Sequence, residues 1–125
     1  MKINLKATGI ELTPEITAYA EKKVSALAKY LRESESVIAQ VEVGKSTQHH
    51  KSGPVFRAEV HLSGPGVDVY AAAEEADLNA AIDVVKDEIA HKLTHEKGKR
   101  EALYRRGARA VKEMMKGINI FKKRP

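Results

Sequence analysis

The sequence contains no cysteine and no tryptophan, and only two of its 125 residues are phenylalanine. The absence of cysteine excludes disulfide bonds, zinc–thiolate sites and thiol chemistry, and it fits a reducing compartment. Because aromatic residues are scarce, the core is expected to be aliphatic. No apolar run approaches the roughly 18 residues that a membrane span requires. The first residues, MKINLKATG, alternate rather than form the apolar centre of a signal peptide. We therefore expect a soluble, cytoplasmic protein with no membrane partner.

Positive charge is unevenly distributed along the chain. The formal net charge is +5, but the segment from Lys97 onward contains 11 basic and 2 acidic residues, a balance of +9. The preceding 96 residues contain 11 basic and 15 acidic residues, a balance of −4. A basic segment on an acidic body is typical of a protein that reaches a polyanionic partner through that segment. A solvated amphipathic tail would give the same composition.

Hydrophobic periodicity divides the chain into strands and helices. Four segments, at 2–8, 36–44, 55–64 and 67–73, alternate apolar and polar residues, which is the period of a half-buried strand. Two others, at about 14–33 and 75–96, repeat apolar residues at three- and four-residue steps and are predicted to be amphipathic helices. Thr13 is a suitable N-cap for the first helix, and Pro14 suits its first position. A further helical tail follows the second helix.

This order predicts an α+β fold of two layers. Each strand has one apolar face and each helix one apolar stripe. A four-stranded, antiparallel-type sheet would therefore carry both helices next to each other on one face. The βαβββα plan is like that of a double-stranded-RNA-binding domain. Gly98 is a plausible helix stop, so we expect a βαβββα domain at 1–98 and a basic helical extension at 99–125.

Cations of the first predicted helix lie along one line. Positions 18, 22, 25, 29 and 32 have the spacing of one helix face. Three of them are the cations Lys22, Lys29 and Arg32, the other two are small residues, and none is acidic. Lys23 and Tyr30 lie on a neighbouring line. Such a line is expected either of a phosphate-binding surface or of an ordinary solvent face that carries lysines.

The second predicted helix mixes its charges. Its cations are Lys86, Lys92 and Lys97. They alternate with carboxylates with which they can form weak intrahelical pairs, so this face favours phosphate less than the first helix does. Lys99 and Arg100 follow at its end and strengthen the positive charge there.

The tail sorts its charge more clearly than either helix. One continuous line at i, i+4, i+7 and i+11 contains no carboxylate. It consists of Arg105, Arg109, Lys112 and Lys116, and Arg106 flanks it. The apolar stripe beside this line is thin, and Gly107 weakens the helix by about 1 kcal/mol. Packing alone is therefore not expected to order the tail.

Metal and enzyme chemistry find little support in the sequence. His91 and His95 have the i, i+4 spacing of metal ligands, but Lys92 stands where a zincin motif needs glutamate, and no third ligand converges. A glycine-rich phosphate loop, a nucleophile elbow and a cysteine nucleophile are all absent. We predict no metal, no cofactor, no small-molecule substrate and no enzymatic activity.

The sequence resembles one known family over roughly residues 1–100. The resemblance is carried by GIELTPEITAYAEKKVSALAKYL at 9–31 and by AEEADLNAAID at 73–83, with Leu93, Thr94 and Lys97 downstream. These segments are similar to the ribosome hibernation-promoting factor family, also called ribosome-associated inhibitor A or sigma-54 modulation protein. The chain looks like a short-type member with a basic C-terminal extension.

The resemblance implies a function without catalysis. Family members bind the small (30S) ribosomal subunit in the channel for mRNA and for the A- and P-site tRNAs. Basic side chains of two adjacent helices contact 16S rRNA, and idle ribosomes are silenced under stress or in stationary phase. The protein is then expected to be monomeric away from the ribosome. Lys23, Tyr30, Lys97 and Lys99 match residue types of the family pattern.

Other positions depart from the family pattern. Ala26 stands where the family often has lysine, and Asn79 where tyrosine is usual. Glu88 and His91 stand where basic residues are common, and the helix surface for RNA is weaker as a result. The rRNA-binding residues that we predict are Lys22, Lys23, Lys29, Tyr30, Arg32, Lys86, Lys92, Lys97, Lys99, Arg100, Arg105, Arg106, Arg109, Lys112 and Lys116. Two alternatives stay open: a general double-stranded-RNA-binding module, and a protein-interaction module that docks through its basic tail.

Overall fold

The structure is a computed structural model, and it describes residues 1–46, 55–95 and 106. The chain divides into two units, Met1–Leu93 and Thr94–Pro125. The loop between the second and third strands, residues 47–54, lies outside the described residues. So do the domain boundary predicted near Gly98 and the tail, apart from Arg106, which is helical and exposed.

Four strands form one sheet, as the alternating segments predict. They are β1 (Lys2–Thr8), β2 (Ile38–Ser46), β3 (Val55–Gly64) and β4 (Val67–Glu75). Their order in the sheet is the order in the chain, β1-β2-β3-β4. A two-residue turn joins β3 to β4, and Gly66 takes a φ of 71° there, which a residue with a side chain rarely adopts.

The sheet is mixed, which corrects the expectation of an antiparallel-type sheet. β1 runs parallel to β2, whereas β2–β3 and β3–β4 are antiparallel. The physical reason is the helix between the first two strands. A helix that crosses one face of the sheet returns the chain to the starting end, so the next strand runs in the same direction.

The first helix is shorter than its apolar spacing predicts. Helix α1 spans Pro14–Ser25, and a 3₁₀ segment, η1, continues from Ala26 to Tyr30. The Thr13 side chain caps α1 by accepting a hydrogen bond of 3.2 Å from the Ile16 backbone N–H. After η1, Leu31 is extended, and a second 3₁₀ segment, η2 (Ser34–Ser36), leads into β2. The prediction of a helix to residue 33 is therefore wrong by a full turn or more.

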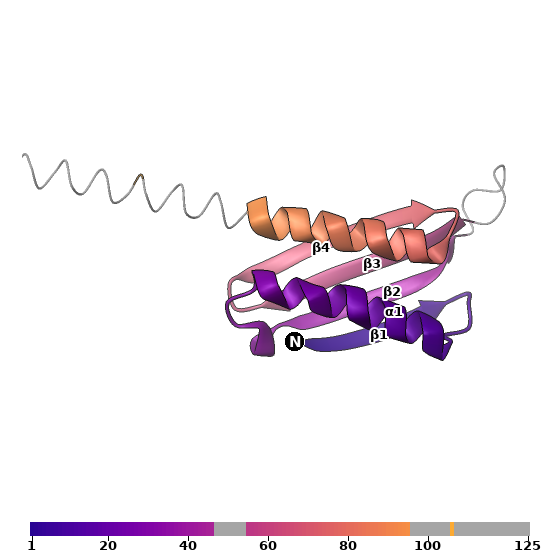
Figure 1. Ribbon diagram of the computed structural model, residues 1–125, viewed down its shortest axis with the longest axis horizontal. Coiled ribbons are helices and arrows are strands. Elements are labelled where there is room, and N and C mark those ends of the chain that lie inside the picture. The colour runs from indigo at the N-terminus through magenta and orange to yellow at the C-terminus, as the bar shows by residue number, and fades with distance from the viewer. Residues whose placement is uncertain (47–54, 96–105, 107–125) are drawn as a thin grey trace, which may run out of the picture. The chain divides into compact units, whose positions relative to one another are not determined.

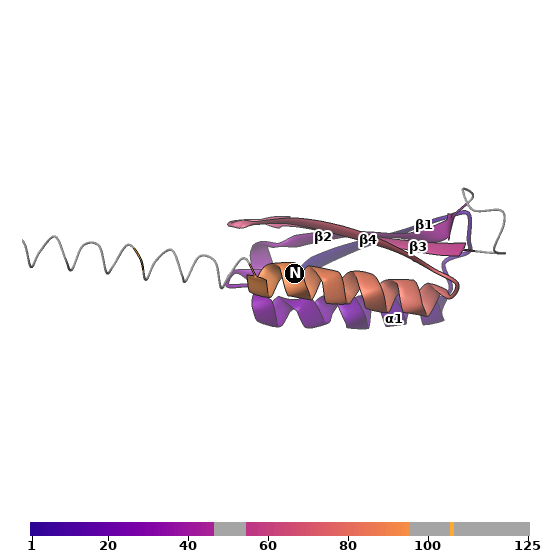
Figure 2. The same cartoon turned by 90° about the horizontal axis from the view of Figure 1, so that it is seen from above.

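The second helix occupies residues 78–95. Its first turn is capped by Asp77, whose carboxylate accepts a hydrogen bond of 3.1 Å from the Ala80 N–H. Both helices cover the same face of the sheet (Figure 2) and lie next to each other (Figure 1), as the two-layer plan predicts. The hydrogen bond from Tyr19 to Asp83 joins them directly.

The core between helices and sheet is aliphatic, as expected from the scarcity of aromatic residues. Apart from Gly44, every buried residue among those described is Ala, Val, Leu or Ile. The largest fully buried side chains include Leu27, Leu62, Ile82 and Ile89. The outer surfaces of α1 and the second helix are thus left for solvent or a partner.

Candidate nucleic-acid interface

The predicted line of cations on the first helix is exposed, but only part of it is helical. Lys22 lies on α1, Lys29 lies in η1, and Arg32 lies in the turn that follows. All three side chains belong to exposed residues. Among the described residues, Lys22 and Arg32 form no ion pair, so their full charge is available to a partner. The Lys29 Nζ lies 5.2 Å from the centroid of the neighbouring Tyr30 ring.

Tyr30 differs from the cations around it. Its side chain is half-buried and packs against the hydrophobic core. Part of the ring therefore stabilises the fold, and the part beneath Lys29 supports that ammonium group by a cation–π contact.

Lys23 faces the second helix rather than solvent alone. Its Nζ lies 3.3 Å from the Asp83 Oδ1, and the same oxygen accepts a hydrogen bond of 2.6 Å from the Tyr19 hydroxyl. The Lys23 Nζ is also 5.5 Å from the centroid of the Tyr19 ring. We call these three residues the helix seam. They tie α1 to the second helix through one carboxylate.

The ionisation of the helix seam follows from these contacts. The hydrogen bond from the Tyr19 hydroxyl lowers the pKa of Asp83 below its usual 3.8, and Lys23 adds to the effect. The hydrogen bond to Asp83 raises the pKa of Lys23 above 10.5 and that of Tyr19 above 10.0. At neutral pH the seam therefore holds a carboxylate, an ammonium group and a neutral phenol.

The described cations of the second helix are engaged by protein atoms. The Lys86 Nζ lies 3.6 Å from the Asp87 Oδ1. The Lys92 Nζ donates a hydrogen bond of 2.5 Å to the backbone oxygen of Tyr70, on the edge strand β4. Lys86 and Lys92 thus differ from Lys22 and Arg32, which the described chain leaves without an acceptor.

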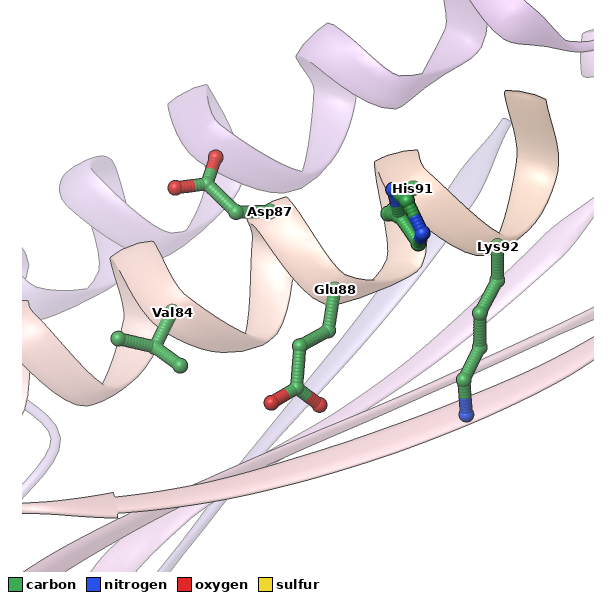
Figure 3. A pocket seen from close by; sticks show the side chains of 5 residues that line it. All are labelled: Val84, Asp87, Glu88, His91 and Lys92. Carbon is green, nitrogen blue, oxygen red and sulfur yellow. The ribbon is translucent and has the colours of Figure 1, made fainter. Parts of the chain in front are cut away.

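A shallow hollow runs along the same helix. It is lined by Val84, Asp87, Glu88, His91 and Lys92. Lys92 and Glu88 extend toward the sheet, whereas Asp87 points to the other side of the helix (Figure 3). Two carboxylates beside one lysine make this hollow a poor receptor for phosphate.

The open face of the sheet carries a polar network that the sequence analysis did not identify. Arg57 contacts Glu59 at 2.7 Å and Glu74 at 3.2 Å, and the bond to Glu59 raises the pKa of the guanidinium further above its already high usual value. His61 lies 2.6 Å from Asp68 and meets the Tyr70 ring edge-on. The alternating pattern predicted that these side chains point outward, but not which of them pair.

The structure brings some of the predicted site residues together and leaves others outside the described chain. Lys22 on α1, Lys29 in η1 and Arg32 in the turn that follows are all exposed, whereas Lys23, Lys86 and Lys92 have acceptors within the protein. Arg106 is exposed. Outside the described residues lie Lys97, Lys99, Arg100, Arg105, Arg109, Lys112 and Lys116.

The described part of the chain has neither a cluster of metal-ligating side chains nor a helix that could span a membrane. Side chains of His, Cys, Asp and Glu do not gather there into a group of three that would hold a metal ion. No helix there is both long enough and apolar enough to cross a membrane.

The fold and its exposed cations define a small α+β domain with one helical face available to a partner. The chain belongs to the family described as Sigma 54 modulation protein / S30EA ribosomal protein, whose model matches residues 3–101. The resemblance found in the sequence is thereby confirmed. The family is one of ribosome-associated factors.

Individual relatives agree with this assignment. A ribosome hibernation promoting factor from Klebsiella oxytoca is 30% identical over 99 residues, which cover 79% of this chain and 96% of the relative. The N-terminal domain of Protein Y from Thermus thermophilus superposes with a TM-score of 0.64 at 30% identity, covering 76% of this chain and 98% of that domain. A ribosomal subunit interface protein from Coxiella burnetii shares the fold, with a TM-score of 0.62 at 17% identity over 78% of this chain and 99% of that protein.

Proposed function

We propose that this protein is a cytoplasmic, non-catalytic ribosome hibernation factor. In this proposal it binds the small ribosomal subunit in the channel for mRNA and for the A- and P-site tRNAs, and it silences idle ribosomes under stress or in stationary phase. Family membership supports the ribosome as the partner. The observation that carries the mode of binding is the row of exposed cations on the first helix and its continuation.

The proposed contacts are to the phosphates of 16S rRNA. Lys22, Lys29 and Arg32 are exposed, and no carboxylate of the described chain pairs with them. Folded RNA is recognised largely through its shape and backbone, which suits a row of cations better than a pocket for bases. The basic extension after Lys97 supplies further cations and offsets the acidic balance of the preceding residues.

A co-sedimentation experiment tests the proposal. The full chain is mixed with purified small subunits over a salt series, together with a Lys22→Gln/Arg32→Gln variant. The slope of log K against log salt is negative, and each phosphate contact that is lost should make it shallower by about 0.7–0.9. The matched control is Lys2→Gln/Lys6→Gln, because these exposed lysines belong to β1 and alternate with its core-facing residues. Equal effects of the two pairs would contradict the proposed surface.

The tail is tested in the full-length chain. Replacement of Arg105, Arg109, Lys112 and Lys116 by glutamine should weaken binding and flatten the salt dependence. An unchanged affinity and slope would exclude the tail from the contact. Binding to a plain RNA duplex as tight as to small subunits would favour a general double-stranded-RNA-binding module. Binding that survives nuclease digestion of the RNA would favour a protein-interaction module.

Inhibition is measured separately from binding. The protein should lower the yield of a cell-free translation reaction, and added mRNA with tRNA should compete with it for small subunits. Sucrose gradients with and without the protein then show whether paired ribosomes accumulate. Binding without competition would place the contact outside the proposed channel.

A further inference from the structure

One carboxylate controls the seam between the two helices. The Asp83 Oδ1 accepts a hydrogen bond of 2.6 Å from the Tyr19 hydroxyl and lies 3.3 Å from the Lys23 Nζ. The Lys23 ammonium is also held 5.5 Å from the Tyr19 ring centroid. Lys23 thus has two partners inside the protein. Its sequence neighbour Lys22 is exposed, and no acceptor in the described chain holds its side chain.

The electrostatic surroundings of the helix seam are negative. Asp87 also acts on Lys23, Asp77 acts on Tyr19, and Lys86 acts on Asp83. Three carboxylates therefore face two ammonium groups there, and one of these ammonium groups, Lys86, lies 3.6 Å from Asp87. An RNA phosphate that approaches the seam meets net repulsion.

We propose that Asp83 is a specificity-determining residue that withholds Lys23 from RNA and keeps phosphate away from the helix seam. RNA then binds along Lys22, Lys29 and Arg32 and does not cross to the second helix in the described part of the chain. This inference rests on the proposed function, because it divides the helical face of that function into a part that accepts phosphate and a part that rejects it.

The degree of exposure makes the inference testable. The Lys23 side chain is 33% exposed and that of Asp83 is 42% exposed. Both groups are reached by water, so burial does not force the pair to form and its removal does not strand a charge in the core. Removal of the Asp83 charge should therefore release Lys23 toward solvent and leave the fold in place.

The decisive variant is Asp83→Asn. The amide oxygen still accepts the Tyr19 hydroxyl, but the negative charge is gone. Binding to small subunits should become about two- to fivefold tighter, the range that an exposed ion pair allows. The negative slope of log K against log salt should steepen by about 0.7–0.9, the value for one phosphate contact, because Lys23 then contacts a phosphate.

Lys23→Gln provides the second arm. In the otherwise unchanged protein, Lys23→Gln should make the negative slope of log K against log salt shallower by much less than Lys22→Gln does. In the Asp83→Asn background it should remove the gain in affinity and slope. A merely structural role for Asp83 would weaken binding in Asp83→Asn and would give no such dependence on Lys23.

Two results of the co-sedimentation series would overturn the inference. The first is a Lys23→Gln effect equal to that of Lys22→Gln, and the second is a folded Asp83→Asn protein whose affinity is unchanged or lower. If Asp83→Asn does not fold, as judged by circular dichroism, the comparison of Lys23→Gln with Lys22→Gln decides alone.

Failure of the proposed function can be distinguished from failure of the role proposed for Asp83. If the wild-type protein does not co-sediment with small subunits, that function is wrong. Elution from heparin then tests Asp83 on its own, because Asp83→Asn should elute at higher salt. Elution of Asp83→Asn at the wild-type salt concentration would also overturn the inference.

Discussion

Gly44 of β2 lies against the backbone of β1, and its replacement by alanine should loosen the edge of the sheet. Gly44 pairs in register with Thr8, the last residue of β1. A Cβ on Gly44 would come closer than 3.0 Å to the Thr8 carbonyl oxygen, a separation that Cβ atoms essentially never show. The obstacle is backbone rather than the end of a flexible side chain, so β1 itself would have to move.

The expected cost follows from how far β1 moves. If only the final pair of the ladder opens, the loss is about one backbone hydrogen bond, or roughly 1 kcal/mol. If the whole strand shifts, its inward side chains Ile3, Leu5 and Ala7 lose contact with the core, and overpacking of this kind costs up to about 3 kcal/mol. The free energy of unfolding should therefore fall by about 1–3 kcal/mol, out of a total of about 5–15 kcal/mol for a small domain.

Urea unfolding followed by circular dichroism measures this loss. Gly44→Ala should lower the midpoint at an unchanged m value, and Lys45→Ala, at the exposed neighbouring position of β2, should move it little. The folded Gly44→Ala protein should still bind small subunits, because the proposed contacts lie on the first helix. A Gly44→Ala midpoint equal to that of the wild type would refute the steric reasoning.

Three further predictions concern the helices. In a spectrophotometric titration, Tyr19 should ionise above its usual pKa of 10.0; the stability that this adds is present below pH 10.0 and is lost as the pH rises through the folded value, and Asp83→Asn should bring the ionisation back down. Ile89→Ala should cost about 2–5 kcal/mol in urea unfolding, because Ile89 is fully buried, whereas Ile89→Val should cost about 0.5–1.5 kcal/mol. Thr13→Ala should cost about 1 kcal/mol by leaving the Ile16 N–H without its cap, and Thr13→Ser should restore most of the loss.

The strands and the two-layer plan could be predicted because alternation determines which residues face a core. The direction of β1 could not, since alternation is the same in parallel and antiparallel strands and only the crossing helix decides it. The end of α1 was missed for a related reason. Val24 and Leu27 are three residues apart, a step that an α-helix and a 3₁₀ segment both place on the buried side.

For the charged residues of the candidate site, too, the sequence pattern does not show which side chains are paired in the folded protein. Lys22 and Lys23 are adjacent and chemically identical in the sequence, yet only Lys23 has a carboxylate opposite, supplied by Asp83 from the second helix. Lys92 looks like one more surface cation, but its acceptor is a backbone oxygen of β4. Periodicity identified which lysines face outward; tertiary contacts between distant segments determine which of them carry an uncompensated charge.

The number of cations without a carboxylate partner limits how many phosphate contacts the described part of the chain can make. Six predicted cations lie on the described helices and in the turn after η1: Lys23, Lys86 and Lys92 have acceptors in the protein, and Lys22, Lys29 and Arg32 have no carboxylate partner among the described residues. Three phosphate contacts give a slope of log K against log salt of about −2 to −3. If the proposed contacts are right, a steeper slope for the full chain comes from the segment after residue 96, where the charge balance is +9. The glutamine variant of the tail removes four of the 11 basic residues of that segment, so the same salt series on it should bring the slope closer to this range.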